Sequence, residues 1–186
     1  MNTLTGMKSR QHGFTMIELI VVIVILGILA AVALPRFTNI QRDARVAKLN
    51  AARGAVQAAA AMIHGTALAR GGNPDTAVCP GTTVTADNIA TVCTENGIVN
   101  IVNRYPAATV AGIVNASGLT SVMNPTVAQL AAEGYQTNGA GPIDIRVTGG
   151  ANPATCFFRY TAAAANAAPQ VGALTPATVN GDTAGC

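Results

Sequence analysis

The chain has 186 residues, of which 50% are hydrophobic and only 10% are charged, with a formal net charge of +3. The length fits one modest domain, and so low a charged fraction is unusual for a free soluble domain. Residues 14–70 hold six basic and two acidic residues, whereas residues 71–186 hold three basic and six acidic ones. An acidic C-terminal part argues against nucleic-acid binding there, because nucleic-acid-binding surfaces are basic.

The first thirteen residues, MNTLTGMKSRQHG, are polar and slightly basic, and an apolar run, FTMIELIVVIVILGILAAVAL, follows them. At a helical rise of ~1.5 Å per residue, residues 14–34 span ~31 Å, which matches the hydrocarbon core of a bilayer. A secretory signal is cut after its apolar run, but no small-residue cleavage site is evident before Pro35. We therefore expect the apolar run to stay in the mature protein as a single-pass membrane helix.

One ionisable residue, Glu18, interrupts this run close to its start. An ionisable group inside a membrane segment costs ~2.5–3.5 kcal/mol on insertion scales, so its presence is by default a functional hypothesis. The alternative is a boundary residue that reaches water.

The stretch Gly13-Phe14-Thr15-Met16-Ile17-Glu18, with the basic leader before it and the apolar run and Pro35 after it, closely resembles the precursors of type IV pilins and pseudopilins. The resemblance implies that residues 1–13 are a leader, although Met7 is a second possible start. It implies that a prepilin peptidase cuts after Gly13 on the cytoplasmic side of the membrane and N-methylates Phe14. It also implies the α+β pilin fold, in which a long N-terminal helix packs against an antiparallel sheet.

Cleavage after Gly13 creates an α-amine at Phe14 that lies in or near the membrane, as does the carboxylate of Glu18. Two isolated charges there are costly, whereas a paired cation and anion cost much less. In a stack of staggered helices, Glu18 of one copy would meet the Phe14 amine of another and set the axial register.

The distribution of basic residues favours the opposite membrane orientation, because Lys8 and Arg10 precede the apolar run and five basic residues follow it within twenty positions. We give more weight to the cleavage motif and the cysteines. We therefore expect the residues after the run to lie outside the cytoplasm.

Residues 36–70 are predicted to continue the helix as an amphipathic stem. One apolar stripe runs through Phe37, Ile40, Ala44, Ala47, Ala51, Ala55, Ala58 and Met62, and another through Leu49, Ala52, Val56, Ala59 and Ile63. We expect both stripes to bury one helix face against the head, and Arg42, Arg45, Lys48 and Arg53 to lie on a solvated face. Gly71-Gly72-Asn73-Pro74 should end the helix.

Gly27 and Pro35 are the weak points of this helix, because glycine costs ~1 kcal/mol and proline ~3 kcal/mol in a helix interior. We expect local loss of helix between them on assembly.

Residues 71–186 are predicted to form a globular head. Strands are expected at residues 98–102, 143–147, 156–162 and 171–174, and short helices at residues 107–115 and 127–133. An antiparallel sheet packed on the stem is the economical arrangement. The segments YPAATVAGI (105–113) and CFFRYT (156–161) and the terminal Gly185-Cys186 resemble pilins of the mannose-sensitive haemagglutinin type, although residues 105–113 would also suit ordinary packing of the head.

All four cysteines follow the apolar run, and an even number in a small exported domain predicts disulfides. The alternatives are reduced buried thiols and a zinc site, for which no C-x-x-C pair or nearby histidine is present. Four cysteines allow three connectivities. We prefer Cys79–Cys93 and Cys156–Cys186, because each pair is nearest in sequence.

No nucleophile–base–acid set, phosphate-binding loop or calcium loop is legible, so we predict no catalytic residue, cofactor or metal. His64 and the scattered acids Asp75, Asp87, Glu95 and Asp144 are expected to be solvated surface residues.

The predicted function is that of a structural subunit of a type IV pilus, used for adhesion or motility and built as a helical homopolymer. Its partners would be copies of itself, the prepilin peptidase and the pilus assembly machinery. It would lie in the bacterial inner membrane before assembly and in an extracellular pilus afterwards. The alternatives are a pseudopilin of a type II secretion system and, from another class, a membrane-anchored enzyme.

Overall fold

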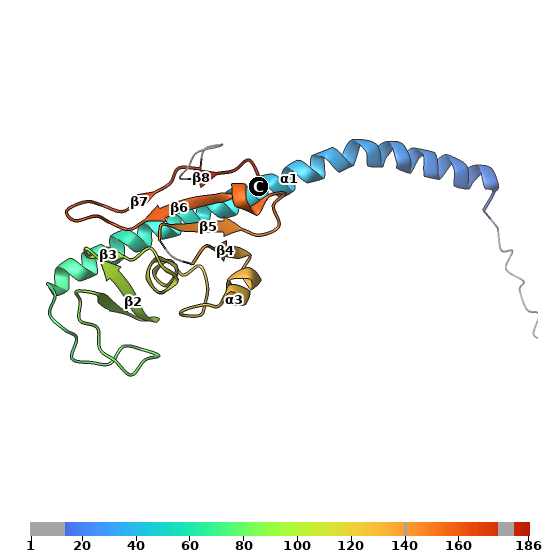
Figure 1. Cartoon of the computed structure of the whole chain (residues 1–186). Coiled ribbons are helices and arrows are strands. Elements are labelled where there is room, and N and C mark those ends of the chain that lie inside the picture. Colours follow the sequence, from blue (N-terminus) through green and yellow to red (C-terminus); the bar gives the residue numbers. More distant parts are fainter. Residues whose placement is uncertain (1–13, 140, 175–180) are drawn as a thin grey trace, which may run out of the picture. The chain divides into compact units, whose positions relative to one another are not determined.

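A computed structural model describes residues 14–139, 141–174 and 181–186 (Figure 1). The leader, with Gly13 of the predicted cleavage site, lies outside the described residues. The chain divides into two compact units, of which the first ends at Gln41 and the second comprises Arg42–Cys186. This division falls inside a single long helix, α1 (Met16–Arg70).

Helix α1 is continuous for 55 residues and passes through both Gly27 and Pro35. It ends at the predicted glycines, since Gly71 and Gly72 adopt φ values of +61° and +78°. These left-handed conformations are the ones that terminate helices and that glycine adopts without a Cβ penalty.

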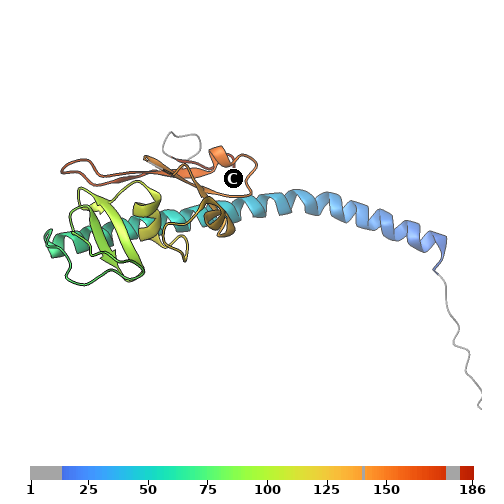
Figure 2. The ribbon, with the colours of Figure 1, turned by 60° about the horizontal axis from the view of Figure 1, so that its bottom comes forward.

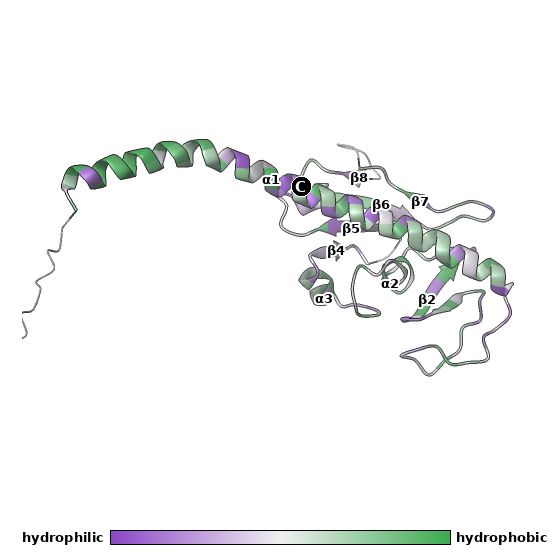
Figure 3. Ribbon diagram, turned by 180° about the vertical axis from the view of Figure 1, so that it is seen from behind, coloured by the Kyte–Doolittle hydropathy of each residue, from purple (hydrophilic) through white to green (hydrophobic). Residues whose placement is uncertain are grey.

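Between Glu18 and Pro35, α1 is apolar on every side, as the hydropathy colouring in Figure 3 shows. All large apolar side chains from Phe14 to Leu34 are exposed, and Phe14 itself is 89% exposed. This part of the helix is long and apolar enough to cross a membrane. A helix that is hydrophobic all round requires an apolar environment, and the described chain supplies none to this segment.

The second unit contains two antiparallel sheets where the sequence predicted one. A three-stranded sheet has the order β1-β2-β3, and in a five-stranded sheet β6 pairs with β5 along one edge and with β7 and β8 along the other. Figures 1 and 2 show the larger sheet running beside the second half of α1, with β2 and β3 nearer the C-terminal end of that helix. The strands are β1 (Thr91–Thr94), β2 (Gly97–Val102), β3 (Tyr105–Pro106), β4 (Tyr135–Thr137), β5 (Ile143–Val147), β6 (Phe157–Thr161), β7 (Gln170–Val171) and β8 (Gly181–Asp182).

Most predicted elements are present with small shifts. Strand β5 has the predicted bounds, β2 differs by one residue at its start and β6 by one residue at each end, and β7 covers residues 170–171 where 171–174 was expected. Helix α3 (Val127–Ala132) matches the prediction, and a 3₁₀ turn, η2 (Pro153–Thr155), lies in the loop between β5 and β6.

The helix predicted over residues 107–115 is instead a π-helix, η1 (Val110–Val114), followed by one turn of α-helix, α2 (Asn115–Ser117). The cause is that the backbone makes a wider turn here than in an α-helix, and one hydrogen bond closes this turn. The N–H of Ile113 donates to the carbonyl of Ala107 at 2.9 Å. At the same point a Cβ on Gly112 would collide with the Ala107 backbone, so glycine is required there.

Two apolar clusters hold the second unit together. The larger joins Leu49, Ala52 and Val56 of α1 to the inward side chains of β5 and β6, with Tyr160 and Phe158 fully buried. The smaller joins Ile63 and Ala67 of α1 to Val92, Val99 and Ile101 of the three-stranded sheet.

Only one of the two predicted stripes of the stem is buried, so the expectation for the other was wrong. Leu49, Val56 and Ile63 are at most 6% exposed, whereas Met62 of the other stripe is 64% exposed. Adjacent helical positions point ~100° apart, so stripes offset by one residue cannot both face the same sheet. Both stripes are apolar in the sequence, so the hydrophobic pattern alone does not show which of them is buried.

Three basic residues of the stem contact the head, which corrects the prediction of a solvated face. Arg45 donates to the carbonyl of Cys186 at 2.9 Å, Lys48 to that of Glu133 at 2.5 Å, and Arg53 to that of Gly172 at 2.7 Å. Lys48 also lies 4.5 Å from the ring centroid of Tyr135. Long cationic side chains can cross apolar surface and deliver donors at their ends, and here they bind three separate segments of the head to α1.

Candidate assembly site

The first turn of α1 is closed by an interaction between Thr15 and Glu18. The Glu18 carboxylate accepts through Oε2 from the backbone N–H and the hydroxyl of Thr15, each at 3.4 Å, and the N–H of Glu18 donates to Thr15 Oγ1 at 3.3 Å. This reciprocal pattern is a capping box, whose sequence signature is Ser or Thr followed three residues later by Glu or Gln. The signature is legible in Thr15-Met16-Ile17-Glu18, and our sequence reasoning missed it.

The cap places a carboxylate at the N-terminal end of the helix, where the helix dipole favours negative charge. The partner of Glu18 in this cap, Thr15, directly follows Phe14 in the sequence. The contacts with Thr15 use Oε2 alone. Within the described chain, Oε1 of Glu18 accepts no hydrogen bond and the carboxylate forms no ion pair. The site therefore contains an exposed carboxylate that is held in place and has no counter-charge among the described residues.

The other two residues of the predicted assembly site, Gly27 and Pro35, lie farther along α1. A Cβ added at Gly27 would meet no atom within 4 Å, so packing within the chain does not require glycine there. Pro35 lies in the helix interior, where proline removes one backbone donor. The helix stays intact through both residues in the single chain.

The structure pairs Cys79 with Cys93 and Cys156 with Cys186, with Cα–Cα distances of 5.5 and 4.8 Å. The first disulfide ties the loop after α1 to strand β1. The second ties the residue before β6 to the C-terminal segment, and both of its cysteines belong to the larger apolar cluster. Each disulfide thus secures a part of the head that has little regular structure of its own.

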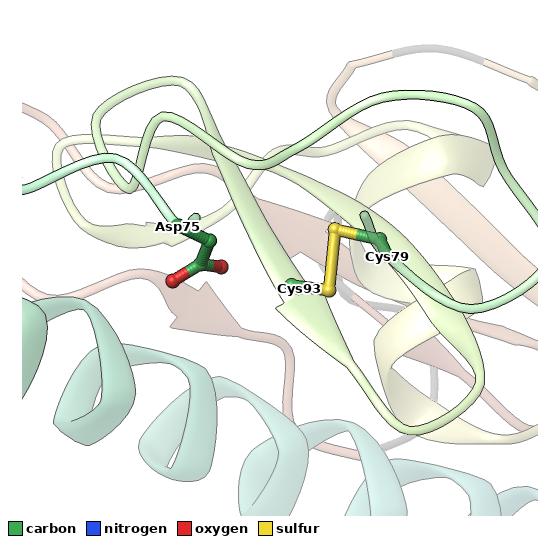
Figure 4. A group of neighbouring side chains, drawn as sticks. All are labelled: Asp75, Cys79 and Cys93. Carbon is green, nitrogen blue, oxygen red and sulfur yellow. A yellow bond between two sulfur atoms is a disulfide. The ribbon is translucent and has the colours of Figure 1, made fainter. Parts of the chain in front are cut away.

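Asp75 lies close to the Cys79–Cys93 disulfide, and the ligand atoms of the three residues lie within 4.8 Å of one another (Figure 4). The sulfurs are bonded to each other, and metals bind cysteine as the thiolate. The Asp75 carboxylate is already bonded to Arg70 at 3.0 Å and to Asn88 at 3.0 Å. Asp75, Cys79 and Cys93 therefore hold the fold together as a structural cluster and do not form a cation site.

The same structural cluster holds the loop that follows α1. Arg70 donates from one nitrogen to Asp75, to Asn88 at 3.1 Å and to the carbonyl of Cys93 at 3.2 Å. Asn88 is only 2% exposed and donates to the carbonyl of Asn73. The end of the stem and the start of the head are thus joined by a polar network.

Asp87 caps the turn before β1 through a single oxygen, Oδ1. This atom accepts from the N–H groups of Ile89, Ala90 and Thr91 at 3.1, 2.9 and 2.8 Å, and from the Thr91 hydroxyl at 2.9 Å. Partial desolvation alone would raise the pKa of Asp87, but these hydrogen bonds outweigh it and lower the pKa to about 2. The carboxylate is therefore an integral part of the turn.

A third acid, Asp144 of β5, is buried and binds two arginines. Arg159 reaches it from Nε at 2.6 Å and from a terminal nitrogen at 3.1 Å, and Arg146 reaches it at 3.3 Å. Hydrogen bonding to Asp144 raises the pKa of Arg159. Asp75, Asp87 and Asp144 are thus structural, which corrects the expectation that they are isolated solvated charges.

Comparison with known proteins identifies the N-terminal region. Residues 8–34 match the family model described as the prokaryotic N-terminal methylation motif. This is the segment that contains Phe14, the Thr15–Glu18 cap and the apolar run.

Curated relatives match longer stretches of the chain than the family model does. The chain is 41% identical over 92 residues to the type IV narrow pilus major component PilA5 of Thermus thermophilus, covering 45% of this chain and 78% of the relative. It is 34% identical over 94 residues to the type IV major pilin protein PilE1 of Neisseria gonorrhoeae, covering 50% of this chain and 44% of that protein. It is 43% identical over 53 residues to the type IV major fimbrial protein FimA of Dichelobacter nodosus, covering 28% and 34%.

No solved structure matches the chain. The match to PilA5 spans most of that protein, and the fold combines a long, half-exposed apolar helix with an antiparallel head. The chain belongs to the type IV pilin family.

Proposed function

We propose that this pilin is the structural subunit of a pilus filament used in adhesion or motility. A prepilin peptidase cuts the precursor between Gly13 and Phe14 and methylates the new amine of Phe14. The protein first lies in the bacterial inner membrane as a single-pass helix. The pilus assembly machinery then transfers it into an extracellular helical homopolymer.

The observation that carries this proposal is the apolar segment formed by Phe14 and the first part of α1, whose large apolar side chains up to Leu34 are all exposed. A lipid bilayer and a bundle of such helices are both dry environments. Transfer from one to the other therefore exposes little apolar surface to water, so the hydrophobic effect that holds the helix in the membrane does not oppose assembly.

Glu18 is the residue to which we assign the axial register. Its carboxylate is held by Thr15 through Oε2, and Oε1 is available to a second group. In the filament that group is the Phe14 amine of a neighbouring copy. The cap positions the anion before assembly, so little side-chain entropy is lost when the pair forms.

Intact-mass measurement of the filament protein tests the processing step. The expected subunit has 173 residues, which are the 186 of the precursor less the 13 of the leader, and carries one methyl group. A subunit that retains residues 7–13 would contradict it.

Two substitutions of Glu18 test the register. Glu18→Gln keeps the capping box, because glutamine also serves at that position, but removes the charge. Glu18→Lys reverses the charge and sets two cations against each other. Loss of one partner of a buried pair typically costs ~3–5 kcal/mol, so the yield of sheared filaments should fall about a hundredfold or more, with Lys worse than Gln.

Glu95→Lys is the matched control, since it reverses an exposed acidic charge on the head without touching α1. All three variants should insert into the membrane. Normal filament yield from Glu18→Lys would show that the carboxylate is only a boundary residue that caps its own helix.

The abundance of the protein decides between pilus and secretion pseudopilus. The relatives described above are named as major pilus or fimbrial proteins, which favours the pilus. The subunit should then dominate the protein content of sheared surface filaments. Trace amounts there would favour the pseudopilin role.

A further inference from the structure

A hollow of about 590 Å³ lies in the head beside the turn between β2 and β3. Its walls are His64 and Leu68 of α1, the turn residues Asn103 and Arg104, Tyr105 of β3, and the loop of residues 165–168. A second hollow of about 400 Å³ adjoins it and shares His64, Tyr105 and Ala168. Each is within the range of small-molecule sites, ~300–1,000 Å³.

Two stacked rings form the main part of the shared wall. The rings of His64 and Tyr105 are stacked, with centroids 3.9 Å apart and planes within 2° of parallel. His64 Nδ1 lies 3.1 Å from the carbonyl of Arg104, which fixes the imidazole as a donor to the turn. Nε2 of His64 has no partner in the described chain and remains available to a ligand.

Arg104 occupies a strained position at the rim of this hollow. It has a φ of +67°, directly after Asn103 with a φ of +52°. A hairpin turn with two positive φ values favours glycine at its second position, and a larger side chain in the left-handed region costs roughly 1–2 kcal/mol. Strain of this kind is concentrated at functional sites.

The guanidinium of Arg104 is exposed, and it forms neither a hydrogen bond nor an ion pair with the described residues. Arg146 and Arg159, by contrast, both form ion pairs with Asp144. None of the described residues that line the hollow is acidic. An anion that entered it would therefore meet a free cation and no opposing charge.

Neutral hydrogen-bonding groups surround this cation. The amides of Asn166 in the first hollow and Gln57 in the second are free of partners in the described chain. Asn103 donates to the carbonyl of Ala163 at 2.8 Å, which leaves its oxygen free. Free amide groups can form hydrogen bonds with hydroxyls, and a guanidinium can pair with a carboxylate. The alanines and the stacked ring pair can contact the C–H faces of a sugar ring.

We propose that this hollow binds an acidic sugar, a pyranose whose carboxylate pairs with Arg104 and whose hydroxyls contact the free amides and His64. The site lies wholly within the second compact unit and does not depend on the filament role of α1. It makes the head a ligand-binding surface in addition to a structural one.

The test uses the full-length protein in an uncharged polyoxyethylene detergent, because this detergent carries neither sugar nor anion. Saturation-transfer NMR and a titration of the His64 ring resonance measure binding of glucuronate, with glucose and acetate as probes of the ring and of the carboxylate alone. Loss of a resonance in His64→Gln assigns the His64 signal. Glucuronate should bind with millimolar affinity, and glucose and acetate at least tenfold more weakly.

Arg104→Gln and Arg104→Gly should each weaken glucuronate binding about tenfold or more. Glycine adopts a positive φ without strain, so a loss of binding in Arg104→Gly would not come from destabilisation of the turn. Arg42→Gln, which removes an exposed arginine of the stem, far from the hollow in sequence, should leave binding within about twofold.

Four outcomes would overturn the proposal: no glucuronate binding at millimolar concentration, equal binding of glucose, equal binding of acetate, or an equal loss in Arg42→Gln. Equal binding of acetate would reassign the hollow to acidic peptide side chains. None of these outcomes bears on filament yield, so failure here is distinguishable from failure of the filament proposal.

Discussion

Residues 16–34 and residues 42–70 belong to one helix, but their side chains are arranged for different surroundings. In the first segment, every large apolar side chain is exposed and the apolar surface covers all sides. In the second segment, Leu49, Val56 and Ala67 are completely buried, while the opposite face remains in contact with solvent. Backbone conformation alone therefore says nothing about which environment a helical segment needs.

The difference lies in where the packing partners come from. The second segment finds its partners within the chain, in β1, β2, β5 and β6. The first finds none among the described residues and must receive them from lipid or from other molecules. Substitutions in the first segment should therefore affect insertion and assembly, and those in the second should affect the free energy of unfolding of the head.

The largest effect is expected from truncation of the core on the stem. Leu49→Ala should lower the free energy of unfolding of the head by ~3–5 kcal/mol, because it leaves a cavity in a fully buried position. Leu26→Ala, the matched change in the exposed segment, should leave that free energy unchanged. All three tyrosines lie in the head, so tyrosine circular dichroism during denaturant titration reports the head alone. Equal losses in both variants would show that the two segments are not independent.

Removal of the Cys156–Cys186 disulfide should have the next largest effect. A closed loop with a sequence separation of 30 residues predicts a loss of ~3–4 kcal/mol in the chain-entropy model when both cysteines become alanine. Membrane insertion should not change, since the first segment of α1 contains no cysteine. Denaturant titration of the head, paired with a membrane fractionation, measures both. A head with unchanged stability would show that the C-terminal segment is held by other contacts.

Tyr160→Phe tests the link between the two sheets. The Tyr160 hydroxyl donates to the carbonyl of Pro106 at 2.7 Å in a buried position, and it connects β6 to β3. Burial is the main cause that raises the pKa of this phenol, with a smaller contribution from Tyr105. Phenylalanine leaves the carbonyl unpaired and should cost the head ~1–3 kcal/mol. Tyr135→Phe is the control, because its half-buried hydroxyl makes no hydrogen bond within the described residues, and should be nearly neutral.

Arg53→Met tests the cationic contacts of the stem. It keeps the apolar side-chain stem but removes the 2.7 Å hydrogen bond to the carbonyl of Gly172. A half-exposed hydrogen bond of this kind contributes ~1 kcal/mol. Arg36→Met removes an exposed arginine of the first unit and should change the stability of the head by less than ~0.5 kcal/mol. Indistinguishable denaturation midpoints would return Arg53 to the solvated face that the sequence suggested.

The sequence predicted those parts of the fold in which local pattern and tertiary partner agree. The segment IDIRV alternates around Ile143, Ile145 and Val147, and β5 has the predicted bounds. By contrast, β8 consists of Gly181 and Asp182, residues that rarely favour strands. It exists because Phe157 and Phe158 pair with it, near a disulfide that brings the C-terminal segment to β6. Such a strand depends on contacts between residues far apart in sequence, and no local pattern records them.

The assembly site was predictable to a similar degree. The position of Glu18 in an apolar run was legible from the sequence, and so was its capping partner Thr15. We interpreted Glu18 only as an assembly residue and did not predict the cap. The hollow around Arg104 was not predictable. It brings together α1, the β2–β3 turn and a loop sixty residues later, and its main signal is a backbone conformation that a sequence does not display.

The smallest effect expected is a dependence of head stability on acid through Asp87. Its pKa is about 2 in the folded head and 3.8 in the reference state, so the folded state binds the proton less readily than the unfolded state. The stability contributed by this carboxylate is therefore complete above pH ~4 and is lost as the pH falls toward 2. Because Asp87 is exposed, solvent screening keeps the loss below ~1 kcal/mol. Asp87→Asn retains a neutral acceptor and does not titrate, so the difference in free energy of unfolding between wild type and variant should shrink between pH 5 and pH 2. Glu18 caps α1 in the other unit, so Glu18→Gln should leave this slope unchanged. Identical pH profiles for wild type and Asp87→Asn would show that the four hydrogen bonds to Asp87 Oδ1 do not depend on its charge.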